Sequence, residues 1–225
     1  DTISENLYKY GFGQKTYLDL YNESSGLIPD RDWKYKIKQE PWYPGETLNV
    51  GIGQGYFLAT PMQLTLATSS LATAGNTFVP HLLLQSIDTK TGDALPYEYK
   101  KNEFTTPYPD ANKLDIVHHA MWRVTNENGV GTASNMKRVR GLEFAGKTGT
   151  AQVYSLDAGK SDKKKLQDHA LFISYAPFEK PEIVVTVIIE HGGSGSTTAA
   201  PIARNIIDFY FNNNMKVSRN DWLCR

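Results

Sequence analysis

Cysteine is almost absent from this chain of 225 residues. The chain also lacks a long apolar run and an excess of charge of either sign. The one cysteine, Cys224, cannot form an internal disulfide and says little about the redox compartment. No stretch approaches the roughly 20 apolar residues that a membrane-spanning helix needs. The 24 basic residues match the 24 acidic ones, so net charge gives no reason to expect nucleic acid or an anionic membrane as a partner.

The residues that are present form an ordinary globular composition, with 40% apolar, 12% aromatic and 21% charged residues. A chain of this length can bury roughly 70% of its unfolded surface, so it needs no disulfide or metal to fold. Residues 1–10 have the periodicity of an amphipathic helix. Because the sequence starts inside this helix and without an initiator Met, we expect it to be a piece of a longer protein.

The pattern of apolar and turn residues predicts a mixture of helices and strands. Residues 22–50 are predicted to form an ordered loop pinned by aromatic side chains. The last strands are consecutive and antiparallel, which favours the α+β class over a doubly wound parallel sheet. The last helix is expected to turn Ile202, Ile206, Phe209 and Tyr210 inward. The predicted helices cover 1–10, 60–76 (opened by a Thr60 capping box), 110–124 and 197–212, and the predicted strands cover 79–87, 95–99, 142–154, 170–175 and 183–190.

Residues 141–150, Gly-Leu-Glu-Phe-Ala-Gly-Lys-Thr-Gly-Thr, fit two unrelated active-site motifs. Residues 141–148 match the P-loop pattern G-x-x-x-x-G-K-[ST], whereas residues 147–150 match the third motif of serine transpeptidases and β-lactamases. A P-loop needs an apolar strand before it and a helix after it. The preceding residues 135–140 are polar, and Gly149 with the following β-branched residues makes a poor helix start, so the sequence favours the second motif.

In this second interpretation the lysine lies on an extended strand along which a peptide binds. Side chains alternate along a strand, so Lys147 and Gly149 point to one face and Thr148 and Thr150 to the other. The ammonium group and the two hydroxyls would contact the terminal carboxylate of a peptide added to the strand edge. Gly149 would let the ligand approach the backbone, and the N–H of Thr150 would point at the carbonyl oxygen that becomes an oxyanion.

Two further signals are weaker. Lys90-Thr91-Gly92 also spells Lys-Thr-Gly, but it lies in a polar turn with no strand to carry it, so we interpret this copy as chance. His118 and His119 are adjacent on a predicted helix and point about 100° apart, so they cannot jointly hold one metal ion.

Several segments, taken together and in this order, resemble the transpeptidase domain of class B penicillin-binding proteins. Residues 147–153 are similar to the third motif of that family, residues 128–133 to the Gly-Thr-Ala segment before it, and residues 168–177 to the strand and turn after it. Residues 42–47, 51–55 and 59–61 are similar to segments of elongation-type members. The resemblance covers nearly all 225 residues.

This resemblance implies the C-terminal part of a single transpeptidase domain over residues 1–225, with a β-lactamase/DD-peptidase-like α+β fold in which helices flank an antiparallel sheet. It implies a peptidoglycan D,D-transpeptidase of cell elongation and shape, which acts on D-Ala-D-Ala stem peptides and is the target of β-lactams. Lys147 would serve electrostatic recognition, Thr148 and Thr150 would bind the carboxylate, and Gly149 would permit close approach. No metal or other cofactor is expected.

The family also implies a nucleophile motif, S-x-x-K, and a second motif, S-x-N or S-x-D. The first pattern occurs at Ser134 and Ser161 and the second at Ser4 and Ser218, but none lies where the family needs it, so we interpret all four as chance. The nucleophile, the second motif and a membrane-anchoring helix are therefore expected upstream of Asp1. The implied location is the periplasmic face of the bacterial inner membrane, and the implied partners are a lipid-II polymerase and shape scaffold proteins, with no nucleic acid.

Two alternatives remain open on the sequence alone. One is a P-loop nucleotide-binding enzyme, which Mg-ATP would stabilise against heat. The other is a non-catalytic relative that only binds partners or cell-wall peptide, and whose complete gene would lack the S-x-x-K serine.

Overall fold

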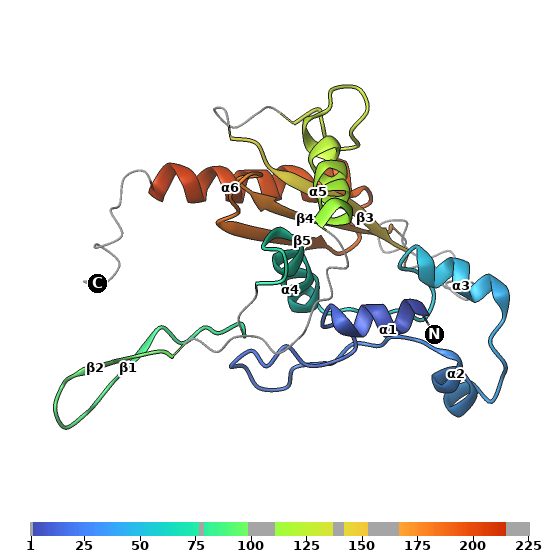
Figure 1. Ribbon diagram of the computed structural model, residues 1–225, viewed down its shortest axis with the longest axis horizontal. Helices are drawn as coiled ribbons and strands as arrows, with labels where there is room; N and C mark the ends of the chain where they lie inside the picture. Colours follow the sequence, from blue (N-terminus) through green and yellow to red (C-terminus); the bar gives the residue numbers. More distant parts are fainter. Residues whose placement is uncertain (1, 77–78, 99–110, 137–141, 153–166, 215–225) are drawn as a thin grey trace. The chain divides into compact units, whose positions relative to one another are not determined.

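The computed structural model describes residues 2–76, 79–98, 111–136, 142–152 and 167–214, which belong to two compact units (Figure 1). The first unit covers residues 1–109 and the second covers residues 110–225. The prediction that both belong to one transpeptidase domain stays a prediction. Within the described ranges, no helix combines the length and the apolar character needed to cross a lipid bilayer.

The described part of the first unit contains short helices and a small antiparallel ribbon. Its apolar cluster is centred on Phe12, Ile28 and Ala67. The elements are α1 (Thr2–Lys9), α2 (Arg31–Lys38), α3 (Pro44–Gly51), α4 (Pro61–Ala72), β1 (Gln85–Ile87) and β2 (Ala94–Pro96).

Helix α4 begins with the predicted capping box. The Gln63 N–H donates to Thr60 Oγ1 at 3.1 Å, and the Thr60 N–H donates to Gln63 Oε1 at 2.9 Å. The buried Gln63 amide also donates from Nε2 to the carbonyl oxygens of Gln14 and Ser25, at 2.7 and 2.8 Å. One side chain therefore starts the helix and fastens two preceding loop segments to it.

Residues 22–50, predicted to be a loop, contain the two helices α2 and α3. The carboxylate of Asp30 caps α2 by accepting the Trp33 N–H at 2.7 Å. At the start of α3, the Glu46 carboxylate accepts the Tyr43 N–H at 2.8 Å. The loop prediction was wrong because these two side-chain caps start short helices among the aromatic and turn-forming residues.

The predicted strands 79–87 and 95–99 are much shorter in the structure, where β1 pairs with β2 over three residues. Before β1, the N–H groups of Leu82 and Leu83 donate to the two carboxylate oxygens of Asp19, at 2.7 and 2.9 Å. A side chain therefore replaces the sheet partner that a longer strand would need.

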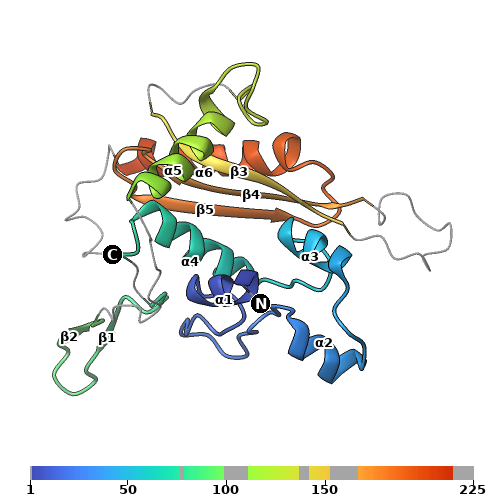
Figure 2. The ribbon, with the colours of Figure 1, turned by 45° about the vertical axis from the view of Figure 1, so that its right-hand side comes forward.

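The second unit is built on an antiparallel sheet with strand order β3-β4-β5 (Figure 2). Strands β4 and β5 form the predicted hairpin, and the α+β prediction is confirmed. The strand predicted over 142–154 is observed over 145–151, and residues 153–154 lie outside the described ranges. The elements are α5 (Ala111–Asn126), β3 (Ala145–Ala151), β4 (His169–Ala176), β5 (Ile183–Ile189), the π-helix η1 (Gly195–Ala199) and α6 (Ala200–Asn214).

The core of this unit lies between the sheet and the last two helical elements. Phe172 of β4 and Val185 and Val187 of β5 pack in one cluster with Ala203 and Ile207 of α6. Small residues at Ala199, Ala200 and Ala203 let η1 and α6 approach the strands closely, so the sheet is held rigidly on this side.

The inward face predicted for the last helix was wrong. Ala203 and Ile207, one helical turn apart, are fully buried. The predicted face contains large apolar side chains of the helix. The face that packs closely on the sheet instead carries a small residue and, one turn later, one branched residue. Of the residues predicted to point inward, Tyr210 is half-buried and the others are exposed: Ile202 by 39%, Ile206 by 43% and Phe209 by 70%.

Candidate functional site

The four residues of the Lys-Thr-Gly-Thr motif lie together on β3. Their partners on β4 run antiparallel from Ile173, opposite Lys147, to Ala170, opposite Thr150. Among the described strands β3 pairs with β4 alone, so it forms one edge of the sheet (Figure 2). The expected extended edge strand is therefore observed.

This geometry contradicts the P-loop alternative. A P-loop lysine and the residue after it stand at the N-terminus of a helix, where backbone N–H groups hold the phosphates. Lys147 and Thr148 instead lie inside a seven-residue strand, and the chain stays in that strand to Ala151. Gly141, the first residue of the P-loop pattern, lies outside the described residues.

The ammonium group of Lys147 is exposed at the sheet. Its Nζ donates a hydrogen bond to the backbone oxygen of Thr148, the next residue, at 2.8 Å. An ammonium group has three N–H donors, and this bond within the described residues uses one of them. The position suits a cation that attracts an anionic ligand to the edge strand.

The hydroxyls of the motif extend from the same strand. Thr148 and Thr150 are two residues apart and therefore on one face of β3. Thr148 is half-buried, and its Oγ1 lies 3.2 Å from Oγ1 of Thr132, in the turn after α5. Thr132 belongs to the Gly-Thr-Ala segment that resembles the family, but the sequence alone gives this threonine no role in the site.

Gly149 lies close to β4, and its backbone lies close to η1. A Cβ on this residue would lie 3.2 Å from Cβ of Leu171, its cross-strand partner. On η1, a Cβ on Gly195 would lie only 2.6 Å from the Gly149 backbone oxygen and 2.4 Å from that of Leu171. The close contact with Leu171 favours a glycine at position 149, and the contacts of η1 favour a glycine at position 195.

The turn between β5 and η1 is fixed to the start of β4. The N–H of His191 donates to Nδ1 of His169 at 2.9 Å, and the N–H of Gly193 donates to the Asp168 oxygen at 2.8 Å. The hydroxyl of Thr198 donates to the oxygen of Gly192 at 2.8 Å. These bonds define where η1 begins and hence how closely it lies over β3.

Tyr175 of β4, opposite Ala145 of β3, supports the strand from the protein interior. Burial, with a smaller effect of the Glu179 charge, raises the pKa of its phenol above the ordinary value, so the group stays neutral. Its ring lies 5.7 Å from that of His118 on α5. Tyr175 therefore helps to fix α5 to the sheet and is no acid or base at neutral pH.

The described serines of the chance motifs have structural roles. Ser134 Oγ donates to the Gly131 oxygen at 2.8 Å, and Ser4 Oγ donates to the Pro29 oxygen at 3.1 Å. Both serines are buried. Ser161 and Ser218 lie outside the described residues. The hydroxyls of Ser134 and Ser4 are therefore engaged in hydrogen bonds to the backbone.

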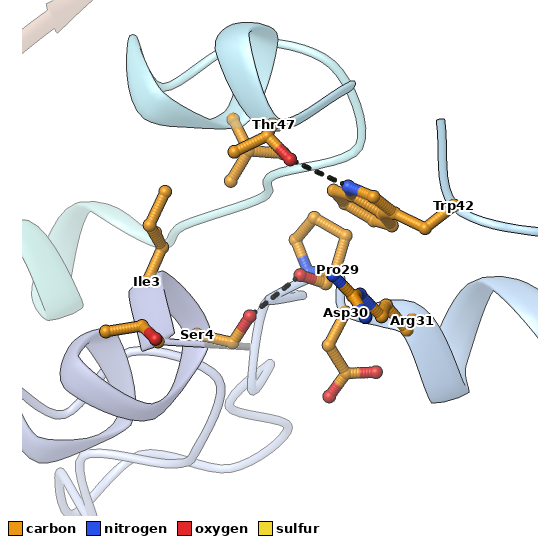
Figure 3. A pocket seen from close by; sticks show the side chains of 9 residues that line it. Ile3, Ser4, Pro29, Asp30, Arg31, Trp42 and Thr47 are labelled. Carbon is orange, nitrogen blue, oxygen red and sulfur yellow. Dashed lines mark hydrogen bonds between the residues drawn. The ribbon is translucent and has the colours of Figure 1, made fainter. Parts of the chain in front are cut away.

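The first unit contains a cavity of about 200 Å³ between α1, α3 and the residues that precede α2 (Figure 3). In its lining the indole N–H of Trp42 donates to Thr47 Oγ1 at 2.8 Å. The Ser4 hydroxyl in the same lining is bonded to Pro29, as described above. These polar groups already have hydrogen-bond partners within the protein, so the cavity gives no indication of a ligand. Strand β3 therefore remains the candidate site.

The sequence matches one family model over most of its length. Residues 1–208 match the model described as "Penicillin binding protein transpeptidase domain". The chain is 39% identical over 222 residues to the "Peptidoglycan D,D-transpeptidase MrdA" of Haemophilus influenzae, a match that covers 94% of this chain and 33% of the relative. The chain thus spans about a third of the length of the curated relatives that it matches.

Solved structures agree with the sequence matches. Penicillin-binding protein 2 of Pseudomonas aeruginosa, in complex with WCK 5153, is 36% identical with a TM-score of 0.73, over 92% of this chain and 43% of that one. Penicillin-binding protein 2 of Helicobacter pylori, in complex with MreC, is 32% identical with a TM-score of 0.72, over 96% of this chain and 36% of that one. The similarity confirms the expected transpeptidase fold.

Proposed function

Because the chain belongs to the penicillin-binding protein transpeptidase family, we propose that it supplies the carboxylate-binding strand of a peptidoglycan D,D-transpeptidase. The observation that carries this proposal is the placement of Lys147, Thr148, Gly149 and Thr150 on an edge strand, where the lysine side chain is exposed and the two threonines share one face. Such an edge suits an extended peptide that ends in a carboxylate.

In the proposed reaction a serine attacks the carbonyl between the two terminal D-Ala residues of a stem peptide. The terminal D-Ala leaves, an acyl-enzyme forms, and an amine of a neighbouring stem peptide then displaces the serine. Lys147 attracts the anionic peptide end and supports the second-motif serine, and Thr148 and Thr150 hold the carboxylate. Charge-assisted hydrogen bonds of this kind contribute about 1.5–3 kcal/mol each. A β-lactam that carries a carboxylate occupies the same place.

The nucleophile of this reaction belongs, in our proposal, to a part of the protein outside these 225 residues, and the chain forms the C-terminal part of the transpeptidase domain. The threefold greater length of the curated relatives supports this assignment. The complete protein would act in cell elongation at the periplasmic face of the inner membrane, held there by an N-terminal helix. Its proposed partners are a lipid-II polymerase and shape scaffold proteins, of which the MreC bound to the Helicobacter pylori relative is one example.

Labelling of the complete protein with fluorescent penicillin tests the proposal. Lys147→Ala should abolish labelling, or reduce it by a factor of at least about 100, because an oriented charge contact to the ligand is lost. The variant should unfold at nearly the wild-type temperature, since the side chain is exposed.

Lys90→Ala is a matched control, because Lys90-Thr91-Gly92 repeats the same three residues in the turn between β1 and β2. This variant should label like the wild type. Normal labelling of Lys147→Ala would refute the assignment of β3, and a complete wild-type protein that never labels would refute the transpeptidase activity itself.

A further inference from the structure

We infer that Thr132 is a positioning residue for the carboxylate site, because its hydroxyl lies 3.2 Å from the hydroxyl of Thr148 on β3. This inference rests on the proposed function. It adds a residue from outside the Lys-Thr-Gly-Thr motif, which acts through Thr148.

The turn that carries Thr132 is anchored on both sides of it. Before it, a Cβ on Gly131 would lie 2.3 Å from the backbone oxygen of Arg123, so only glycine fits against the last turn of α5. After it, Ala133 is 3% exposed, and its N–H donates to the oxygen of Val124 at 3.0 Å. Thr132 is exposed between these two anchors, so its side chain is presented at the surface by a fixed backbone.

The same end of α5 is bonded to the residue that leads into β3. Thr125 Oγ1 and Asn126 Nδ2 both donate to the backbone oxygen of Phe144, at 2.5 and 2.8 Å. Thr125 and Asn126 are buried, so water does not compete for these bonds. The distance between the Thr132 and Thr148 hydroxyls is therefore set by two segments that are fixed to each other.

The hydroxyl chemistry fixes the direction of the contact when a ligand binds. A threonine hydroxyl has one hydrogen to donate and lone pairs that accept. If Thr148 donates its hydrogen to a carboxylate, it can only accept from Thr132, which must be the donor. A donor behind a hydroxyl polarises it and holds its hydrogen toward the ligand. Thr132 would thus strengthen the bond between Thr148 and the carboxylate.

The test compares Thr132→Val and Thr132→Ser in the complete protein. Valine keeps the shape of threonine without the hydroxyl, and serine keeps the hydroxyl. The second-order rate constant of acylation is measured by competition with fluorescent penicillin, once with benzylpenicillin and once with its methyl ester, which has no carboxylate. Thr89→Val, an exposed threonine in the turn between β1 and β2, is the matched control.

We expect Thr132→Val to lower acylation by benzylpenicillin about 3- to 10-fold, which corresponds to about 0.6–1.4 kcal/mol. Acylation by the methyl ester should be unchanged, and Thr132→Ser and Thr89→Val should react like the wild type with both compounds. An equal loss with both compounds would assign Thr132 a purely structural role and overturn the inference, as would no loss with either or a failure of serine to restore the rate. A wild-type protein that reacts with neither compound would overturn the proposed function, and this inference with it.

Discussion

The ammonium group of Lys34, on α2, is buried in the first unit and balanced by a carboxylate on α3. Its side chain is 1% exposed, and Nζ lies 2.5 Å from Oε1 of Glu46 and 4.1 Å from the centre of the Tyr43 ring. Burial alone would lower the pKa of Lys34, but the hydrogen bond and charge of Glu46, with the charge of Glu40, raise it above the ordinary value. Removing Glu46 would leave the buried ammonium with the more distant and exposed carboxylate of Glu40, at 3.6 Å, as its remaining partner among the described carboxylates.

The same pair predicts how the stability depends on pH. The hydrogen bond from Lys34, with that from the Tyr43 N–H, lowers the pKa of Glu46 below its ordinary value of 4.5. A carboxylate with a depressed folded-state pKa contributes stability above its unfolded pKa and loses it as the pH falls through the folded pKa. The melting temperature of the complete protein should therefore fall below about pH 4.5, with Glu46 as one contributor.

Glu46→Gln should melt several degrees lower than the wild type at about pH 7, and the difference should shrink as the pH falls through the lowered pKa of the folded-state carboxylate and protonation removes its charge. Thermal unfolding as a function of pH measures this difference. Glu98→Gln, at an exposed glutamate, is the control and should follow the wild type throughout. A difference between Glu46→Gln and wild type that stays constant with pH would contradict the assigned ion pair.

Among the elements, η1 lies close to β3 because Gly195 has no side chain. Gly195→Ala would place a methyl group 2.4 Å from the Leu171 oxygen and 2.6 Å from the Gly149 oxygen, so η1 must move away from the sheet. Overpacking of this kind costs about 1–3 kcal/mol. The variant should unfold earlier than the wild type and label several-fold more slowly with fluorescent penicillin, because β3 loses its support.

The matched control is Gly45→Ala, in the first turn of α3, where a Cβ would meet nothing within 4 Å. Alanine favours a helix over glycine by up to about 1 kcal/mol, so this variant should be as stable as the wild type or slightly more stable. Wild-type labelling and stability of Gly195→Ala would show that the contact between η1 and β3 does not support the site.

The sequence predicted the elements that have a strong local signal. The Thr60 capping box located α4, and two apolar runs joined by a proline-containing turn located the β4–β5 hairpin. It failed where a distant side chain decides the structure. The carboxylate of Asp19 accepts hydrogen bonds from the N–H groups of Leu82 and Leu83, more than 60 residues away. Only the short strand β1 is therefore observed where a long strand was expected.

For the candidate site, the motif identified Lys147, Thr148, Gly149 and Thr150 and their strand, but not the residues that hold the strand in place. The contact between Thr132 and Thr148 joins two segments whose approach depends on how α5 packs against β3. Gly195 allows the backbone of η1 to lie close to that of β3, and no sequence pattern reports a distance between two backbones. Local patterns therefore located the motif, whereas tertiary packing determined its support.

At the scale of the whole molecule, the chain provides one part of the proposed active site. It spans about a third of the length of its curated relatives, and the described residues contain β3, the strand for which we propose carboxylate binding. The proposed function therefore depends on which chemical group β3 binds when the complete protein reacts.

A crystal structure of the complete protein acylated by benzylpenicillin tests this most directly. We predict that the carboxylate of the bound penicillin lies within hydrogen-bond distance, about 2.5–3.0 Å, of the hydroxyl oxygens of Thr148 and Thr150, with Lys147 beside it. A carboxylate held by other residues, with both hydroxyl oxygens more than about 4 Å away, would contradict the assignment of β3.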